Sequence, residues 1–158
     1  MKQIDNHVQE YIESSVLCWL ATANSKNFPN VSPKEMFLNI DTEHILIANI
    51  ASPNSINNIV ENHQVCVSFI NIFIQKGYKI KGLASIIEVV DAEYAAILEV
   101  FHKKYGTGYP IKSFIKIAIK KIYPIIAPSY NFYPETADSV RIEGAMKTYN
   151  VAPISSKE

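Results

Sequence analysis

The chain has 158 residues, with 15 lysines and arginines against 15 aspartates and glutamates. A chain of this length forms one ordinary domain and can bury about 70% of its unfolded surface without disulfides or metals, so we expect a single domain over residues 1–158. The balanced charge leaves no positive excess for a polynucleotide or an anionic membrane, and we expect neither as a partner.

The first residues carry no export signal. The segment MKQIDNHVQEYIES lacks the apolar core of a signal peptide, and no stretch reaches the ~20 apolar residues that cross a bilayer. We therefore expect a soluble, cytoplasmic protein. Cys18 and Cys66 each lie in an apolar run, far apart in sequence, which favours two reduced, packed thiols over a disulfide.

Apolar periodicity and turn composition predict a series of strands interrupted by helices. Three segments have the capping residues and apolar spacing of helices: residues 5–14, two to three turns from Ser52, and residues 91–106. Six apolar runs are predicted strands: residues 16–23, 28–40, 44–50, 65–74, 78–90 and 111–127.

Individual residues add detail to three of these strands. Pro29 and Pro33 remove two backbone donors from the strand at 28–40, which should therefore lie at a sheet edge or carry a bulge. The strand at 78–90 is expected to be the longest, because its pattern passes from alternating to continuously apolar. Trp19 has apolar neighbours, so we expect it in the core.

The segment at 111–127 fits two patterns. Its lysines recur at the spacing of one helical face, at positions 112, 116 and 120, whereas its isoleucines alternate as in a strand. The high isoleucine content favours the strand. From Pro128 on, the chain is rich in Pro, Tyr and Asn and is expected to run as loop and short extended pieces over the surface.

Antiparallel strands joined mostly by turns, with helices after the third and fifth strands, predict a mainly β fold. We expect a small closed or nearly closed barrel with helices packed outside. The usual catalytic and nucleotide-binding motifs are absent from the sequence. The four histidines are separated and have no carboxylate at metal-ligand spacing, so we expect no metal site.

The helix after the third strand begins with a surplus of small polar side chains. Ser52 and Pro53 already supply the residues that start a helix, and Ser52 is expected to cap it. Asn54, Ser55 and Asn57 add hydrogen-bonding groups where free amides and the helix dipole favour an anion. The segment therefore predicts a phosphate site, with a plain solvated helix face as the alternative.

Short motifs accompany this helix start along the chain. They are Ala21-Thr22 before a turn, Pro29 and its strand, Ala48-Asn49, Glu61-Asn62-His63-Gln64-Val65, and Lys76-Gly77-Tyr78 leading to Gly82-Leu83-Ala84. Together they resemble the pyridoxamine 5′-phosphate oxidase-like family, the FMN-binding split barrels, over residues 10–100. The resemblance implies a homodimer that holds FMN in a groove between its two copies.

The resemblance also implies the residues of the flavin site. The phosphate would lie between the second strand and the helix start, with the ring along residues 31–34, beside Asn49, and Tyr78 at the groove edge. The candidate cofactor-binding residues are Val31, Ser32, Pro33, Lys34, Asn49, Ser52, Asn54, Ser55, Asn57, Lys76 and Tyr78. No catalytic residue is assigned.

The chain departs from the family in its charge at the phosphate. The oxidase has a basic residue on the second strand and an Arg-Lys pair at the helix start, where this chain has Ser32 and then Asn54 with Ser55. Lys34 and Lys76 are the lysines best placed to replace that charge, although exposed strand lysines are often only solvated.

The function that the resemblance implies is that of an FMN-dependent oxidoreductase acting between a nicotinamide or another donor and a small acceptor. Pyridoxamine phosphate is not expected as its substrate, because Arg141 is the only arginine. The alternatives are a non-catalytic flavin-binding or stress-related protein, and a split barrel that uses a deazaflavin or haem. The aromatic tail at Tyr130, Phe132 and Tyr133 would form a lid, an interface or a packed end.

Overall fold

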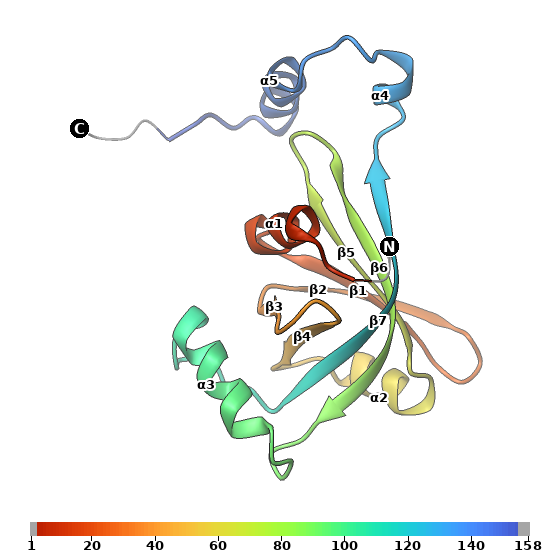
Figure 1. Cartoon of the computed structure of the whole chain (residues 1–158), viewed down its shortest axis with the longest axis vertical. Coiled ribbons are helices and arrows are strands. Elements are labelled where there is room, and N and C mark those ends of the chain that lie inside the picture. Colours follow the sequence, from red (N-terminus) through yellow and green to blue (C-terminus); the bar gives the residue numbers. More distant parts are fainter. Residues whose placement is uncertain (1–2, 155–158) are drawn as a thin grey trace.

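The computed structural model describes residues 3–154 and is built around one antiparallel sheet of seven strands, in the order β2-β1-β5-β6-β7-β4-β3. The sheet curls into an open half-barrel with helices around it (Figure 1). This is the mainly β, antiparallel architecture with flanking helices that the sequence predicts. The sheet is open, whereas a closed or nearly closed barrel was expected, and one helix lies on its inner face.

The elements follow the predicted order as far as the last strand. The strands are β1 (Cys18–Ala23), β2 (Pro29–Lys34), β3 (Phe37–Asn39), β4 (His44–Asn49), β5 (Gln64–Asn71), β6 (Lys76–Ile87) and β7 (Ser113–Ile126). The helices are α1 (Asn6–Ser14), α2 (Pro53–Glu61), α3 (Tyr94–Tyr105), α4 (Ser129–Phe132) and α5 (Asp138–Tyr149).

The main core lies on the inner face of the sheet beneath α1. Asp5 caps this helix as expected, since its carboxylate accepts a hydrogen bond from the Val8 N–H at 2.9 Å. Val8 and Ile12 form the buried side of α1 and pack in one cluster with Phe37 and Phe69, whose ring centroids are 5.2 Å apart. The helix therefore closes the inside of the half-barrel.

A second core lies on the outer face of the sheet beneath α3. Tyr94, Ile97 and Phe101 are buried there, and the rings of Phe101 and Phe114 lie 4.8 Å apart. Gly106 ends α3 at φ 82°, a left-handed conformation that glycine adopts without strain. Helix α3 thus covers the outer side of the β7 and β4 part of the sheet.

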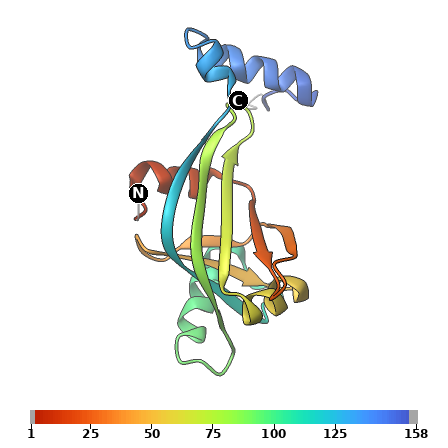
Figure 2. The same cartoon turned by 90° about the vertical axis from the view of Figure 1, so that its right-hand side faces the viewer.

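The outer face of β1 and β2 carries exposed apolar side chains instead. Trp19 is 43% exposed and Val31 is 59% exposed, while Cys18 and Leu20 on either side of Trp19 are fully buried. The expectation that Trp19 lies in the core is wrong, because its position in the strand alternation points it outward. Figure 2 views the long strands β5, β6 and β7 from this side of the molecule.

The segment at 28–40 forms both edges of the sheet. It is interrupted at Glu35 and Met36, so β2 becomes one edge strand and β3 the other. The predicted edge position of this segment is therefore confirmed. Prolines are tolerated in an edge strand, because a missing N–H on its open side breaks no hydrogen bond of the sheet.

Strand β7 settles the ambiguity at 111–127 in favour of a strand. It has 14 residues against 12 in β6, so the expectation that β6 is the longest strand is wrong. Only its first part, residues 113–118, pairs with β4, whereas β6 accompanies it to Ile126. The extra length carries the chain past the barrel.

The chain beyond β7 was expected as loop and short extended pieces, and that expectation is wrong. Residues 127–154, here called the C-terminal arm, contain α4 and α5 and stand beyond the β5–β6 hairpin (Figure 1). Helix α5 begins with an acidic residue, Asp138, and ends at Asn150 with φ 53°. The helix buries no residue, so its apolar residues form only a weak stripe. The sequence therefore shows no clear helical periodicity here.

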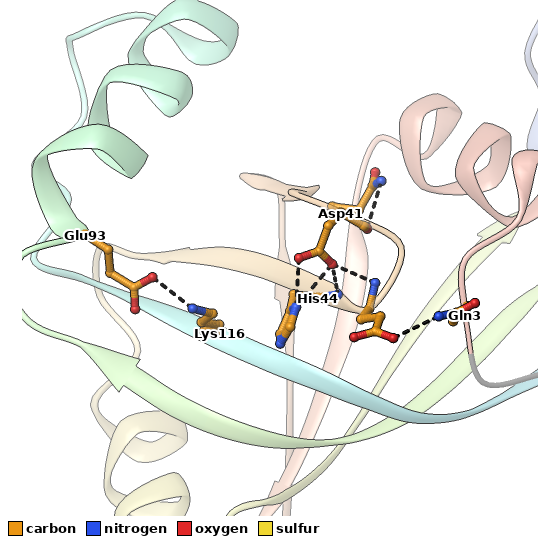
Figure 3. Close-up of polar contacts among 7 residues, drawn as sticks. Gln3, Asp41, His44, Glu93 and Lys116 are labelled. Atoms are coloured by element: carbon orange, nitrogen blue, oxygen red, sulfur yellow. Dashed lines mark hydrogen bonds and ion pairs between the residues drawn. The ribbon is translucent and has the colours of Figure 1, made fainter.

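Polar contacts fix the turn between β3 and β4 (Figure 3). The Asp41 carboxylate accepts hydrogen bonds from the N–H groups of Glu43 at 2.6 Å and His44 at 2.7 Å. Burial raises the pKa of Asp41, but these hydrogen bonds and the His44 ring outweigh it and hold the pKa below its usual value. On the outer face, Lys116 of β7 pairs with Glu93 at 2.8 Å and so ties the entry of α3 to the sheet.

Phe101→Ala tests the core beneath α3. The fully buried ring leaves a cavity when it is removed, so we expect a loss of about 3–5 kcal/mol in the free energy of unfolding, measured by chemical denaturation. Val100→Ala is the matched control, because Val100 is 46% exposed on the same helix and its loss should stay within about 0.5 kcal/mol. Equal losses in the two variants would contradict the packing described.

Candidate functional site

The start of α2 is held against the end of β4 by a buried amide. Pro53 occupies the first turn of the helix, as predicted. The Ser52 N–H donates to Asn49 Oδ1 at 3.2 Å, and Asn49 Nδ2 donates to Ser113 Oγ at 2.9 Å. Both Asn49 and Ser113 are buried, so the backbone of Ser52 is fixed by groups that water does not reach.

Lys34 brings a buried positive charge to this helix start. Its side chain points inward from the end of β2, is 7% exposed, and donates from Nζ to Ser52 Oγ at 2.5 Å. Among residues 3–154 no carboxylate forms an ion pair with Lys34. Burial lowers the pKa of Lys34, and the nearby Cys18 partly offsets that shift. A buried ammonium whose acceptor is a neutral hydroxyl favours an anion beside it.

The Ser52 hydroxyl makes no capping hydrogen bond to α2, so the expected side-chain cap is wrong. Its oxygen accepts from Lys34 instead. The first intrahelical hydrogen bond runs from the Ile56 N–H to Ser52 O at 3.1 Å, so the N–H groups of residues 54 and 55 lie ahead of it. These amides and the helix dipole add donors for an anion at the same end.

A polar network joins the start of α2 to β2 and β1. Ser55 is 1% exposed, and its Oγ lies 3.2 Å from Ser32 Oγ and 3.5 Å from Asn30 Nδ2. Thr22 Oγ1 accepts from Asn58 Nδ2 at 3.0 Å. Sequence reasoning missed Thr22 and Asn30. Their signal is a polar side chain at an inward position of a strand, a position that apolar residues usually fill.

Four other candidates lie near this end with their side chains exposed. Asn54 and Asn57 are exposed on α2, and among the described residues their side chains have no hydrogen-bonding partner. Val31 and Pro33 are exposed on the outer side of β2. The structure thus gathers nine of the eleven candidates around β2, the end of β4 and the start of α2.

Lys76 and Tyr78 lie at the opposite end of β6. Lys76 Nζ is 3.3 Å from the Asp138 carboxylate, and the Tyr78 hydroxyl is 3.0 Å from His7 Nδ1. The part of β6 that lies near α2 is the region of Ala84, whose N–H donates a hydrogen bond to the carbonyl of His63, just after the end of α2. Eight strand residues separate Ala84 from Lys76, which is about 26 Å. Within one chain these two residues do not meet the other nine.

An opening of about 330 Å³ lies beside Lys34 and Ser52. Its walls include Met36, Ile50, Tyr105 and Tyr109, of which the two tyrosines come from the end of α3 and the loop after it. Sequence reasoning missed these tyrosines, because no local pattern shows that this loop returns to β2. The arrangement provides an anion subsite beside an apolar and aromatic wall.

The described residues contain neither a cluster of metal ligands nor a membrane-spanning helix. Within residues 3–154, no group of three or more His, Cys, Asp and Glu residues could hold a metal ion. None of the helices in that part of the chain is long and apolar enough to span a membrane.

The family model of pyridoxamine 5′-phosphate oxidase matches residues 4–125. The chain belongs to the pyridoxamine 5′-phosphate oxidase-like family. The match spans α1 to α3, includes every strand, and ends one residue before the end of β7. The C-terminal arm lies outside it. A comparison with curated proteins gave no match.

Solved structures with the same fold support this membership. HupZ from Group A Streptococcus has a TM-score of 0.68 at 21% identity, covering 77% of this chain and 93% of HupZ. An FMN-binding protein from Syntrophomonas wolfei has a TM-score of 0.65 at 15% identity, covering 76% of this chain and 84% of that one. HutZ, a heme storage protein from Vibrio cholerae, has a TM-score of 0.63 at 16% identity, covering 77% of this chain and 94% of HutZ. At these identities the likeness establishes the split-barrel fold.

The stability of the ligand-free protein should depend on pH through Lys34. Its folded pKa lies below the unfolded value of about 10.4, so the unfolded chain binds the proton more tightly. The destabilisation caused by burying the charged ammonium is complete at pH values below the pKa of Lys34 in the folded protein. It decreases as the pH rises from that value toward the pKa of the unfolded chain. We expect Lys34→Met to be more stable than the parent at pH 7 and to lack this rise, measured by denaturant unfolding between pH 7 and 10.

Lys103→Met is the control for this measurement, because the Lys103 side chain is 73% exposed and should change neither stability nor its pH dependence. A Lys34→Met variant that keeps the parent's rise with pH would show that the ammonium is not the group responsible.

Proposed function

We propose that this chain is a cytoplasmic, homodimeric flavoprotein that binds FMN and transfers electrons between a reduced nicotinamide, or another donor, and a small acceptor. The observation that carries the proposal is the buried ammonium of Lys34, held by the neutral hydroxyl of Ser52 at the start of α2. A phosphate supplies the negative charge that this arrangement lacks.

The residues present fit the phosphate of FMN. Lys34 would donate a charge-assisted hydrogen bond, and the N–H groups of residues 54 and 55 would donate at the positive end of α2. The side chains of Asn54 and Asn57, which have no hydrogen-bonding partner within residues 3–154, add neutral donors on the same helix. Asn49 acts indirectly by fixing the Ser52 backbone. One ammonium and several neutral donors take the place of the basic cluster expected in the oxidase.

The opening beside Lys34 supplies the rest of the environment. FMN, when bound, supplies the hydride and electron-transfer chemistry, so the chain needs no acid, base or nucleophile of its own. The strand residues Val31 to Lys34 would orient the cofactor along the β2 edge. Met36, Tyr105 and Tyr109 would exclude water from the wall opposite.

Exposed apolar side chains support the homodimer. A groove of about 660 Å³ between the start of β1 and the end of β5 is lined in part by Val16, Trp19 and Ile72, of which Val16 is 83% exposed. A second copy that covers this outer face would bury them. It would also be the source of Lys76 and Tyr78, which one chain does not bring to its own site.

Haem binding is the second candidate, because HutZ, a heme storage protein, shares the fold at a TM-score of 0.63. His7 and His44 have partners in Tyr78 and Asp41, which leaves His63 and His102 as the imidazoles without a ring partner in the described part of the chain. An absorption spectrum separates the candidates. Flavin bands support FMN and a Soret band supports haem, while bound FMN without nicotinamide oxidation marks a non-catalytic flavin-binding protein.

Lys34→Met should weaken FMN binding far more than riboflavin binding. Loss of a charge-assisted hydrogen bond costs about 1.5–3 kcal/mol, which corresponds to roughly 10- to 100-fold in Kd for FMN. Riboflavin has no phosphate, so its Kd should stay within about twofold of the parent value. Flavin fluorescence titration measures both constants, with Lys103→Met as the exposed control. Equal losses for the two flavins would place the phosphate elsewhere.

Trp19→Lys should convert the dimer to a monomer. A lysine ammonium at the centre of an apolar interface is desolvated without a partner, so association should weaken at least 100-fold. Light scattering coupled to size exclusion measures the mass of each variant, and Lys103→Met should remain dimeric. A parent protein that elutes as a monomer would remove the dimer from the proposal, whatever the FMN titration shows.

A further inference from the structure

The C-terminal arm encloses a cavity of its own. It has a volume of about 310 Å³ and lies between α5 and the β5–β6 hairpin. Phe73, Tyr130, Arg141, Gly144 and Tyr149 are among its lining residues, and the rings of Phe73 and Tyr149 meet edge to face at 6.2 Å. The family match ends at residue 125, before the arm, and none of the residues that line the cavity is a candidate flavin residue.

Tyr130 fastens the arm to the hairpin. Its hydroxyl is shared between the Ile74 carbonyl and the Asp138 carboxylate, which each accept at 2.9 Å. Two cations contact its ring, with Lys76 Nζ 4.0 Å and the Arg141 guanidinium carbon 3.8 Å from the ring centroid. These cation–π contacts and the two hydrogen bonds of the hydroxyl hold the arm beside the cavity.

The charges around Tyr130 do not balance. Lys76 forms an ion pair with Asp138 at 3.3 Å, whereas in the described part of the chain Arg141 forms none. Hydrogen bonds from Tyr130 and Lys76 hold the pKa of Asp138 below its usual value, and the charges of Lys76 and Arg141 lower it further. Two cations and one carboxylate leave one net positive charge, and it lies on the residue that faces the cavity.

Arg141 retains donors for an acceptor in the cavity. Its Nε donates to Thr136 O at 3.3 Å, Nη1 to Ser129 Oγ at 3.1 Å and Nη2 to Tyr133 O at 2.6 Å. All three acceptors are neutral. A guanidinium has five N–H bonds, so one N–H remains on each terminal nitrogen as a donor for an anionic acceptor such as a carboxylate.

Gly144 keeps the cavity open. It lies inside α5, where glycine is about 1 kcal/mol less favourable than alanine. A Cβ at this position would meet nothing within 4 Å, and the residue has no positive φ. Neither crowding nor backbone conformation requires a glycine here. Gly144 lines the cavity together with Arg141 and the two aromatic rings, so a side chain at this position would enter open space beside them.

We propose that this cavity binds a small organic carboxylate with a flat apolar body. The carboxylate pairs with Arg141, and the apolar body packs against Phe73 and Tyr149 where Gly144 leaves room. None of the candidate flavin residues lines this cavity, so benzoate binding and FMN binding can be measured separately.

Isothermal titration calorimetry of the full chain with benzoate and with its neutral isostere benzamide tests whether binding depends on the negative charge of the ligand. We expect benzoate to bind at least tenfold more tightly than benzamide. Gly144→Leu should weaken benzoate at least tenfold by filling the cavity, with no loss of melting temperature, because the added side chain enters open space and a better helix former replaces glycine.

Glu143→Leu is the matched control, since it adds the same side chain to an exposed neighbouring position of α5 that does not line the cavity. It should leave benzoate binding unchanged. Equal affinities for benzoate and benzamide, or benzoate binding that survives Gly144→Leu, would overturn the site. FMN affinity should be the same in both variants, which keeps this result separate from the flavin titration.

Discussion

The site depends on one interaction, the hydrogen bond from the buried Lys34 ammonium to the Ser52 hydroxyl. An ammonium taken out of water is unfavourable unless charge or hydrogen bonds compensate for it, and here the chain supplies one neutral oxygen. The surrounding geometry maintains that imbalance. Asn49 and Ser113 fix the backbone of Ser52 from the barrel side, while the packed serines 32 and 55 hold β2 against α2. The fold thus holds the ammonium beside the start of α2, and the proposed phosphate would compensate for its burial.

The two halves of the outer face of the sheet are covered differently. On the β7 and β4 side, α3 covers the outer face and builds a second core with Phe114. On the β1 and β2 side, Trp19 and Val31 remain exposed on an otherwise ordered sheet. The exposed apolar half is the surface that the second copy would cover in the proposed dimer.

Local patterns in the sequence predicted every strand region and the first three helices, because periodicity, caps and turn residues act over a few positions. They also indicated the start of α2 as an anion site, through its excess of small polar residues. They failed for Trp19, since the side of a strand that a helix covers is decided by elements distant in sequence. They missed Tyr105 for the same reason. Helix α5 was not predicted, because it buries no apolar stripe. Its attachment through Tyr130 and Arg141 leaves no periodic pattern in the sequence.

The length of β7 has a consequence for solubility. Beyond Ala118, β4 no longer accompanies it, and within residues 3–154 no other strand pairs along that side. A long apolar strand with such an edge is a template for strand addition by another molecule, which leads to aggregation. The chain places Lys120, Lys121 and Pro124 in this stretch, two solvated charges and a residue without an N–H donor. These residues act as gatekeepers that let β7 extend beyond the barrel and carry the arm without recruiting foreign strands.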